Sequence, residues 1–286
     1  MNPGRSYRTS PLCHDGSMGS EDFRYRRLPV IDKRVLRLGL ACNFGIDAAG
    51  VEWALGEGGM QYVFWTPRQK VATEVLRRAL KRDRDRYAVA TGPTTALWSG
   101  NLRRYVDKVR TSLDVDQIDV LQMFWLGKTS RWAPKIVTEL ESLRDEGAVR
   151  AIGISIHDRK RAAELARNSS LDLLMVRFNA AHPGAEHDIF PHLPEGRHTI
   201  VSYTATCWRY LLRRPKKWQG PMPTAGDCYR FCLSSPHVDV TLTGPANLEQ
   251  LQENLAALEK GTLSVEEMAM FRELGPLVKA RGYSWI

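Results

Sequence analysis

The sequence predicts a single α/β domain built as a closed (β/α)8 barrel. The chain has 286 residues, of which 43% are hydrophobic, so it is long enough to bury one large core. Short apolar runs alternate eight times with longer segments of helical period, which is typical of βαβ units and a parallel sheet. Eight such units are sufficient to close a barrel.

Each predicted strand is almost entirely apolar, as expected where helices cover one face and the barrel interior the other. The predicted strands are residues 36–42, 62–65, 87–91, 120–125, 151–156, 173–178, 199–203 and 238–243. Helical periodicity predicts helices over residues 48–56, 70–81, 101–113, 134–146, 159–168, 185–192, 224–234 and 248–260, and a ninth over 264–281 that packs after the barrel.

Several helix ends have a local cause in the sequence. Pro134 suits a first helical turn, where its missing N–H costs nothing, and Gly147 suits the left-handed position after a helix. Asn247 is a candidate N-cap. Ser264 and Glu267 have the spacing of a capping box.

The first 21 residues are rich in Ser, Gly, Pro and Arg and lack periodicity, which predicts a flexible tail at 1–21 before a barrel at 22–286. An apolar signal region and a membrane-length apolar run are both missing, so we expect a cytoplasmic protein that does not bind membranes. Cys228 and Cys232 are four residues apart, and we interpret them as a buried apolar pair. No metal site is predicted.

The net charge is +9, but the basic residues are scattered, with clusters at 24–37, 81–86 and 213–217. No nucleic-acid-binding motif accompanies them, so we expect no nucleic-acid partner. A basic barrel mouth would instead attract a phosphorylated or acidic small molecule.

The segment SSPHVDVTLTGPANLEQLQENLAAL at residues 234–258 resembles a signature of the aldo/keto reductase superfamily. The resemblance extends from about residue 27 to 275. In that family the loop after strand eight and the following helix hold the adenosine phosphate of NADP(H), where helix amides and a glycine favour an anion. By resemblance, the adenosine-end residues are Gly244, Asn247, Gln250 and Asn254. The alternative is a capped amphipathic helix that only closes the barrel.

Three further segments, AIGISIH, LLMVRFN and IVSYTATCW, resemble the family's nicotinamide site. By resemblance, Tyr203 stacks on nicotinamide, Thr204 replaces a usual Ser, and the other contacts come from Ser155 and Asn179. Ile156 and Met175 replace two amide-recognition side chains. Loss of these directed hydrogen bonds weakens cofactor binding by about 1 kcal/mol each, so NADP(H) is expected, if at all, in a weakened site.

The family reduces carbonyls with a Tyr, Lys, Asp and His tetrad, and this sequence departs from it at every position. Phe64, about Gln69, Gly92 and Phe124 take the places of Asp, Tyr, Lys and His. Loss of general acid catalysis alone lowers a rate by about 10²–10⁴. Ordinary carbonyl reduction is therefore not expected.

His157, Arg177 and His182 are the candidate replacements at the barrel mouth. A histidine base beside a guanidinium that holds a carboxylate or phosphate is one interpretation. The alternative is that both histidines are surface residues and that Arg177 pairs with a buried acid.

Two functions remain open. The first is a divergent aldo/keto-reductase-like protein, a nicotinamide-linked oxidoreductase acting on a small aromatic or acidic molecule without the usual tetrad. The second is a catalytically inactive barrel that binds a ligand or a regulatory protein partner. Fold alone does not choose between them.

Overall fold

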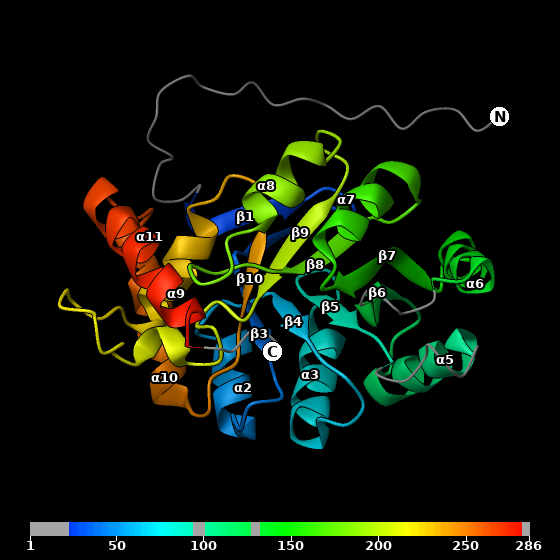
Figure 1. Cartoon of the computed structure of the whole chain (residues 1–286). Helices are drawn as coiled ribbons and strands as arrows, with labels where there is room; N and C mark the ends of the chain where they lie inside the picture. The colour runs from blue at the N-terminus through cyan, green and yellow to red at the C-terminus, as the bar shows by residue number, and fades with distance from the viewer. Residues whose placement is uncertain (1–22, 94–100, 127–131, 282–286) are drawn as a thin grey trace.

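The computed structural model describes residues 23–93, 101–126 and 132–281, and within them eight parallel strands close into a barrel (Figure 1). This confirms the predicted fold. The strands lie in the order β10-β3-β4-β5-β6-β7-β8-β9. Their bounds are β3 Leu38–Ala41, β4 Tyr62–Phe64, β5 Ala88–Thr91, β6 Ile118–Leu126, β7 Val149–Ile156, β8 Leu173–Arg177, β9 Thr199–Tyr203 and β10 Val240–Thr243.

Helices surround the barrel, as the sequence periodicity predicts (Figure 1). They are α2 Ala48–Leu55, α3 Lys70–Arg82, α5 Leu102–Leu113, α6 Pro134–Asp145, α7 Arg159–Asn168, α8 Ala185–Asp188, α9 Ala225–Leu233, α10 Leu248–Ala257 and α11 Val265–Lys279. One predicted helix differs. Residues 185–192 form the single turn α8 followed by a 3-10 turn, η1 Phe190–His192, because Pro191 cannot donate a backbone hydrogen bond in a continued helix. Two more 3-10 turns are η2 Tyr210–Leu212 and η3 Leu258–Lys260.

The predicted helix ends are confirmed. The Asn247 side chain accepts a hydrogen bond from the Gln250 N–H at the start of α10. Ser264 and Glu267 form both bonds of a capping box at the start of α11. Gly147 has φ 77° after α6, so the ends of these helices follow from local side-chain chemistry.

An antiparallel hairpin, β1 Tyr25–Leu28 and β2 Lys33–Leu36, precedes the barrel and was not predicted. Leu28, Ile31 and Val35 of the hairpin are buried in the same cluster as the side chains of the barrel interior. Since the chain enters β3 directly from β2, the hairpin covers the amino-terminal end of the barrel. The basic cluster at 24–37 therefore lies away from the mouth.

Two cations of this basic cluster are buried structural groups. Lys33 pairs with Asp119 across 2.8 Å, and Asp119 also pairs with Arg84 at 2.9 Å. Burial lowers the pKa of Lys33, against the raising effect of Asp119. Arg37 is fully buried and donates to four backbone carbonyls, which satisfies its guanidinium without a carboxylate.

The predicted tail at 1–21 lies outside the described residues. Cys228 and Cys232 are both buried in the hydrophobic core, as an apolar pair would be. Among the described helices, none has the length and hydropathy needed to cross a bilayer.

Candidate functional site

The carboxyl ends of the strands form the mouth of the barrel, where barrel proteins place their binding and catalytic groups. The mouth has an apolar floor. Phe64 and Phe124 contact edge to face with ring centroids 5.3 Å apart, and Met175 and Tyr203 belong to the same cluster. Two of the positions that the resemblance assigned to catalytic Asp and His are thus filled by packed aromatic rings.

Gly92, the position that the resemblance assigns to the family's Lys, has no room for any side chain. A Cβ atom placed on Gly92 would lie 1.7 Å from the backbone oxygen of Gln122 and 3.0 Å from a ring carbon of Phe124. The end of β5 therefore packs directly against the backbone of β6. Restoring a lysine here would require the two strands to separate.

Gln69, near the family's Tyr position, supports a turn. It is the N-cap residue of α3, and its side-chain oxygen accepts a hydrogen bond from the Thr66 N–H at 2.8 Å. An amide has no proton to give at neutral pH, so Gln69 does not replace a phenolic acid.

Strand register brings Arg177 and Tyr203 together. They are Cα partners on β8 and β9, so their side chains leave the sheet on the same face. The Tyr203 hydroxyl lies 3.3 Å from the ring nitrogens of His157, beyond the end of β7. Burial raises the pKa of Tyr203 to about 12, although Arg177 and Ser155 act in the opposite direction. The predicted residues Ser155, His157, Arg177 and Tyr203 therefore form one cluster.

Both predicted histidines are weak bases. Burial first, and the charge of Arg177 second, lower the pKa of His157 and bring that of His182 to about 4. Both imidazoles are neutral at pH 7. They can accept a proton or a hydrogen bond, but they cannot serve as cationic general acids there.

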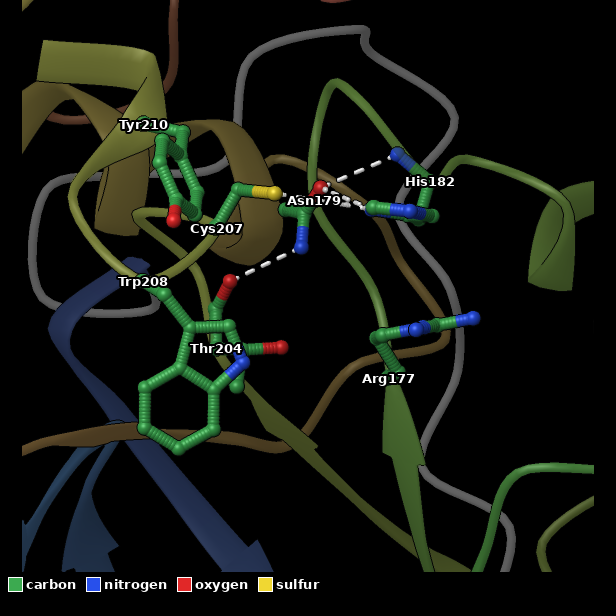
Figure 2. A pocket seen from close by; sticks show the side chains of 7 residues that line it. All are labelled: Arg177, Asn179, His182, Thr204, Cys207, Trp208 and Tyr210. Atoms are coloured by element: carbon green, nitrogen blue, oxygen red, sulfur yellow. Dashed lines mark hydrogen bonds between the residues drawn. The ribbon is translucent and has the colours of Figure 1, made fainter. Parts of the chain in front are cut away.

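Asn179 braces the loops after β8 and β9. Its amide nitrogen donates to the Thr204 carbonyl at 2.8 Å, and its amide oxygen accepts from the His182 backbone N–H at 2.9 Å. The His182 ring lies 3.3 Å from the same oxygen and 3.7 Å from the Cys207 sulfur (Figure 2). Most of the hydrogen-bonding capacity of Asn179 is thus used inside the protein.

These groups line a narrow cleft between the loops after β8 and β9. Figure 2 shows Arg177 and Trp208 on opposite sides of it. Thr204, Cys207, Trp208 and Arg209 all have positive φ angles between 49° and 68°. Non-glycine residues rarely adopt this conformation, and such strain gathers at functional sites. The cleft is lined by Arg177, Asn179, His182, Thr204, Cys207, Trp208 and Tyr210.

The predicted adenosine-end residues lie where β10 leads into α10. Asn247 caps α10, and the Gln250 side chain accepts from the Ala246 N–H at 3.0 Å. Asn254 is buried and donates to the Thr243 hydroxyl at 3.2 Å. Gly244 packs under the ring of Phe44. The backbone N–H groups of Ala246 and Gln250, at the start of α10, therefore already have acceptors inside the protein.

Metal chemistry has no visible support within the described ranges, where His, Cys, Asp and Glu form no group of three or more able to hold an ion. Burial raises the pKa of Cys207 to about 11. A protonated, buried thiol is a poor metal ligand and a poor nucleophile.

A closed parallel barrel with its polar cluster at the carboxyl mouth defines the class of (β/α)8 barrel proteins. Within that class the chain belongs to the aldo/keto reductase family, whose sequence profile matches residues 45–207, more than half of the chain. Curated protein sequences include no match.

Solved structures share the fold at low identity. An aldo-keto reductase from Bacillus halodurans, in its holo form, has a TM-score of 0.72 and 22% identity, covering 88% of this chain and 96% of that one. An aldo/keto reductase from Klebsiella pneumoniae, in complex with NADP and acetate, has a TM-score of 0.70 and 20% identity over 88% and 95%. A glycerol dehydrogenase from Gluconobacter oxydans has a TM-score of 0.68 and 18% identity over the same shares.

Sequence reasoning missed Phe44 and Trp208, which contact one another at the mouth. Phe44 is followed by a glycine, a possible signal for a turn that presents its ring. The positive φ angles around Trp208 fall on non-glycine residues, so they could not be predicted from the residue types.

Proposed function

We propose that this chain is an aldo/keto reductase family member that binds a small anionic molecule with a flat or apolar part at its barrel mouth, and that it does not reduce carbonyls through the family's tetrad. The observation that carries this proposal is the contact of Gly92 with the backbone of Gln122, which leaves no space for a lysine. Electrostatic help for a hydride-accepting carbonyl is therefore missing at that position.

The remaining titratable groups support the same proposal. A Tyr203 hydroxyl with a pKa near 12 is a weaker acid than free tyrosine, whereas a proton donor for carbonyl reduction needs a lowered pKa. His157 and His182 are neutral at pH 7. None of these groups is tuned to protonate a developing alkoxide.

Arg177 supplies the recognition chemistry. A guanidinium binds a carboxylate or phosphate through two parallel hydrogen bonds, and it is always charged. The neutral imidazoles of His157 and His182 add no positive charge, and they can contribute only hydrogen bonds to a bound anion. Phe64, which is only partly buried, offers an apolar surface for the flat part of the ligand, and the buried Phe124 ring packs behind it.

The nicotinamide end does not fit the cofactor that the family implies. Ile156 and Met175 replace amide side chains, and the Asn179 amide already bonds to Thr204 and His182. A bound carboxamide would therefore have fewer directed partners, although the buried Ser155 hydroxyl has no hydrogen-bond partner among the described residues and could serve as one.

A nicotinamide-linked oxidoreductase is the second candidate. Tyr203 lies at the carboxyl end of β9, where the resemblance places the ring that stacks on nicotinamide, and the Klebsiella relative binds NADP. Calorimetric titration with NADPH separates the candidates. Failure to bind up to millimolar concentration supports the anion-binding function, and micromolar binding would favour the oxidoreductase.

Anion recognition is tested with benzoate and inorganic phosphate as probes. Arg177→Gln removes the guanidinium, and we expect it to weaken probe binding at least tenfold, equivalent to about 1.4 kcal/mol. Arg82→Gln is the matched control, because Arg82 is exposed in the last turn of α3, away from the mouth. Equal losses in both variants would show that the effect is one of net charge, and the proposed site would be wrong.

A further inference from the structure

An exposed aromatic ring lies on the glycine at the end of β10. A Cβ atom on Gly244 would lie 2.1 Å from Cδ2 of Phe44 and 2.7 Å from two further atoms of its ring. The ring therefore rests on the bare Cα of Gly244. Gly244 is also the residue that the resemblance assigns to close approach of a cofactor phosphate, so Phe44 occupies one face of that approach.

The backbone around Phe44 holds it in this place. Gly45 has φ 113°, a conformation that residues with side chains rarely adopt, and it directs the loop after β3 toward the loop after β10. A Cβ on Gly45 would lie 3.5 Å from the Ala246 carbonyl oxygen, which shows that the two loops touch.

The second partner of Phe44 is Trp208, from the loop after β9. Their ring centroids are 6.3 Å apart with an interplanar angle of 57°, within the range of an attractive aromatic pair. Trp208 also lines the cleft opposite Arg177 (Figure 2). Thus one aromatic contact connects the cleft with the loop between β10 and α10.

Core packing does not account for this contact. Phe44 and Trp208 are 45% and 48% exposed, and they are two of the four large hydrophobic residues exposed in the described part of the chain. Exposed apolar surface that gathers at one place marks a binding surface more often than scattered residues do. A functional role at the mouth explains why two such rings meet there.

We infer that Phe44 and Trp208 form an aromatic bridge that covers Gly244 and keeps an extended dinucleotide off the loop after β10. Arg177 and Trp208 line the narrow cleft beside the bridge, and the bridge restricts the ligand of that cleft to an anion with a single ring, a statement of ligand size that rests on the proposed function. Phe44 is then the residue that determines this specificity, since it occupies the face of Gly244 that a phosphate would otherwise approach.

The test compares Phe44→Ala with Val71→Ala, a control that removes another exposed apolar side chain, 56% exposed in the first turn of α3. NADPH, adenosine 2′,5′-bisphosphate and benzoate are titrated by calorimetry, which does not depend on tryptophan fluorescence. We expect Phe44→Ala to bind both nucleotides about tenfold more tightly than the parent chain, because removal of a ring contact of this kind changes affinity by about that factor. Val71→Ala should match the parent.

Unchanged nucleotide binding in Phe44→Ala, or micromolar NADPH binding by the parent chain, would overturn the inference. If Phe44→Ala does not fold, Phe44→Leu replaces it, because leucine keeps apolar cover but cannot lie flat on Gly244; intermediate affinity is then expected, and parental affinity would overturn the inference. When the proposed function holds, the Phe44 and Val71 variants bind benzoate within about twofold of the parent. If the parent chain does not bind benzoate, but Phe44→Ala still binds the nucleotides more tightly than the parent, the proposed function is refuted and the bridge is supported.

Discussion

Gly92→Ala tests the central observation about the barrel mouth. Alanine adds one carbon, which would lie 1.7 Å from the Gln122 oxygen, whereas real Cβ contacts essentially never fall below 3.0 Å. The ends of β5 and β6 must therefore move apart by about 1.3 Å, the difference between these two distances. Both colliding groups are held by backbone, so rotation of a side chain cannot relieve the contact.

The expected loss of stability follows from this displacement. Overpacking a well-packed core costs typically about 1–3 kcal/mol, and a clash between backbone groups belongs at the upper end of that range. For a domain of this size a loss of about 3 kcal/mol lowers the melting temperature by roughly 6–12 °C. Gly92→Lys should be at least as unstable, and it should not gain carbonyl reductase activity.

Differential scanning calorimetry of Gly92→Ala measures this loss directly. Gly56→Ala is the matched control, because its Cβ would meet nothing closer than the Glu52 carbonyl oxygen at 3.3 Å and its φ is −88°. The control should melt within about 2–4 °C of the parent, corresponding to a change below about 1 kcal/mol. A Gly92→Ala protein with the parent's melting temperature would refute the reasoning, since it would show that the strands can separate here without cost.

Three other perturbations have defined outcomes. Asp119→Asn leaves the Lys33 ammonium buried without its carboxylate, so urea denaturation should show a loss of about 3–5 kcal/mol, and a loss below about 1 kcal/mol would contradict the structural role of the pair. Asn247→Ala removes a cap and should cost about 1 kcal/mol in the same assay; weaker nucleotide binding with unchanged stability would instead favour a cofactor role. The folded-state pKa of His182, about 4, lies below the ordinary histidine value of 6.5, so the unfolded chain binds that proton first as the pH decreases. The free energy of unfolding should therefore fall as the pH decreases from 6.5 to 4, and it should fall less in His182→Gln than in the parent. If the free energy of unfolding depends on pH in the same way in both proteins, His182 does not contribute to the loss.

The strands and most helices were predictable because their causes are local. A strand covered on both faces is expected to be apolar, and the run at 173–176 shows this pattern. Helix ends such as those at Asn247 and Ser264 depend on one side chain and the amides three residues later. The amino-terminal hairpin was missed because its cations are neutralised by partners from distant segments, as when Lys33 meets Asp119.

The candidate site was predictable in part for a topological reason. In a parallel barrel all strands end at the same mouth, so His157, Arg177 and Tyr203 had to lie near one another once the strands were placed. The hydrogen-bond partners of the residues at the mouth could not be predicted from this topology. Asn179 could equally have faced a cofactor, and only the loop geometry commits its amide to Thr204 and His182.

By itself the sequence determined the barrel and its helix caps, because each depends on residue type and on neighbours within a few positions; the departures from the tetrad follow from the resemblance alone. Only the tertiary structure decided that Gly92 lies against the backbone of Gln122, and that Phe44 lies on Gly244 beside Trp208. These contacts join segments 30 to 200 residues apart, and their distances depend on strand register and loop conformation. A difference of one or two ångströms there decides whether a side chain or a phosphate fits, and no local pattern in the chain encodes a distance of that size.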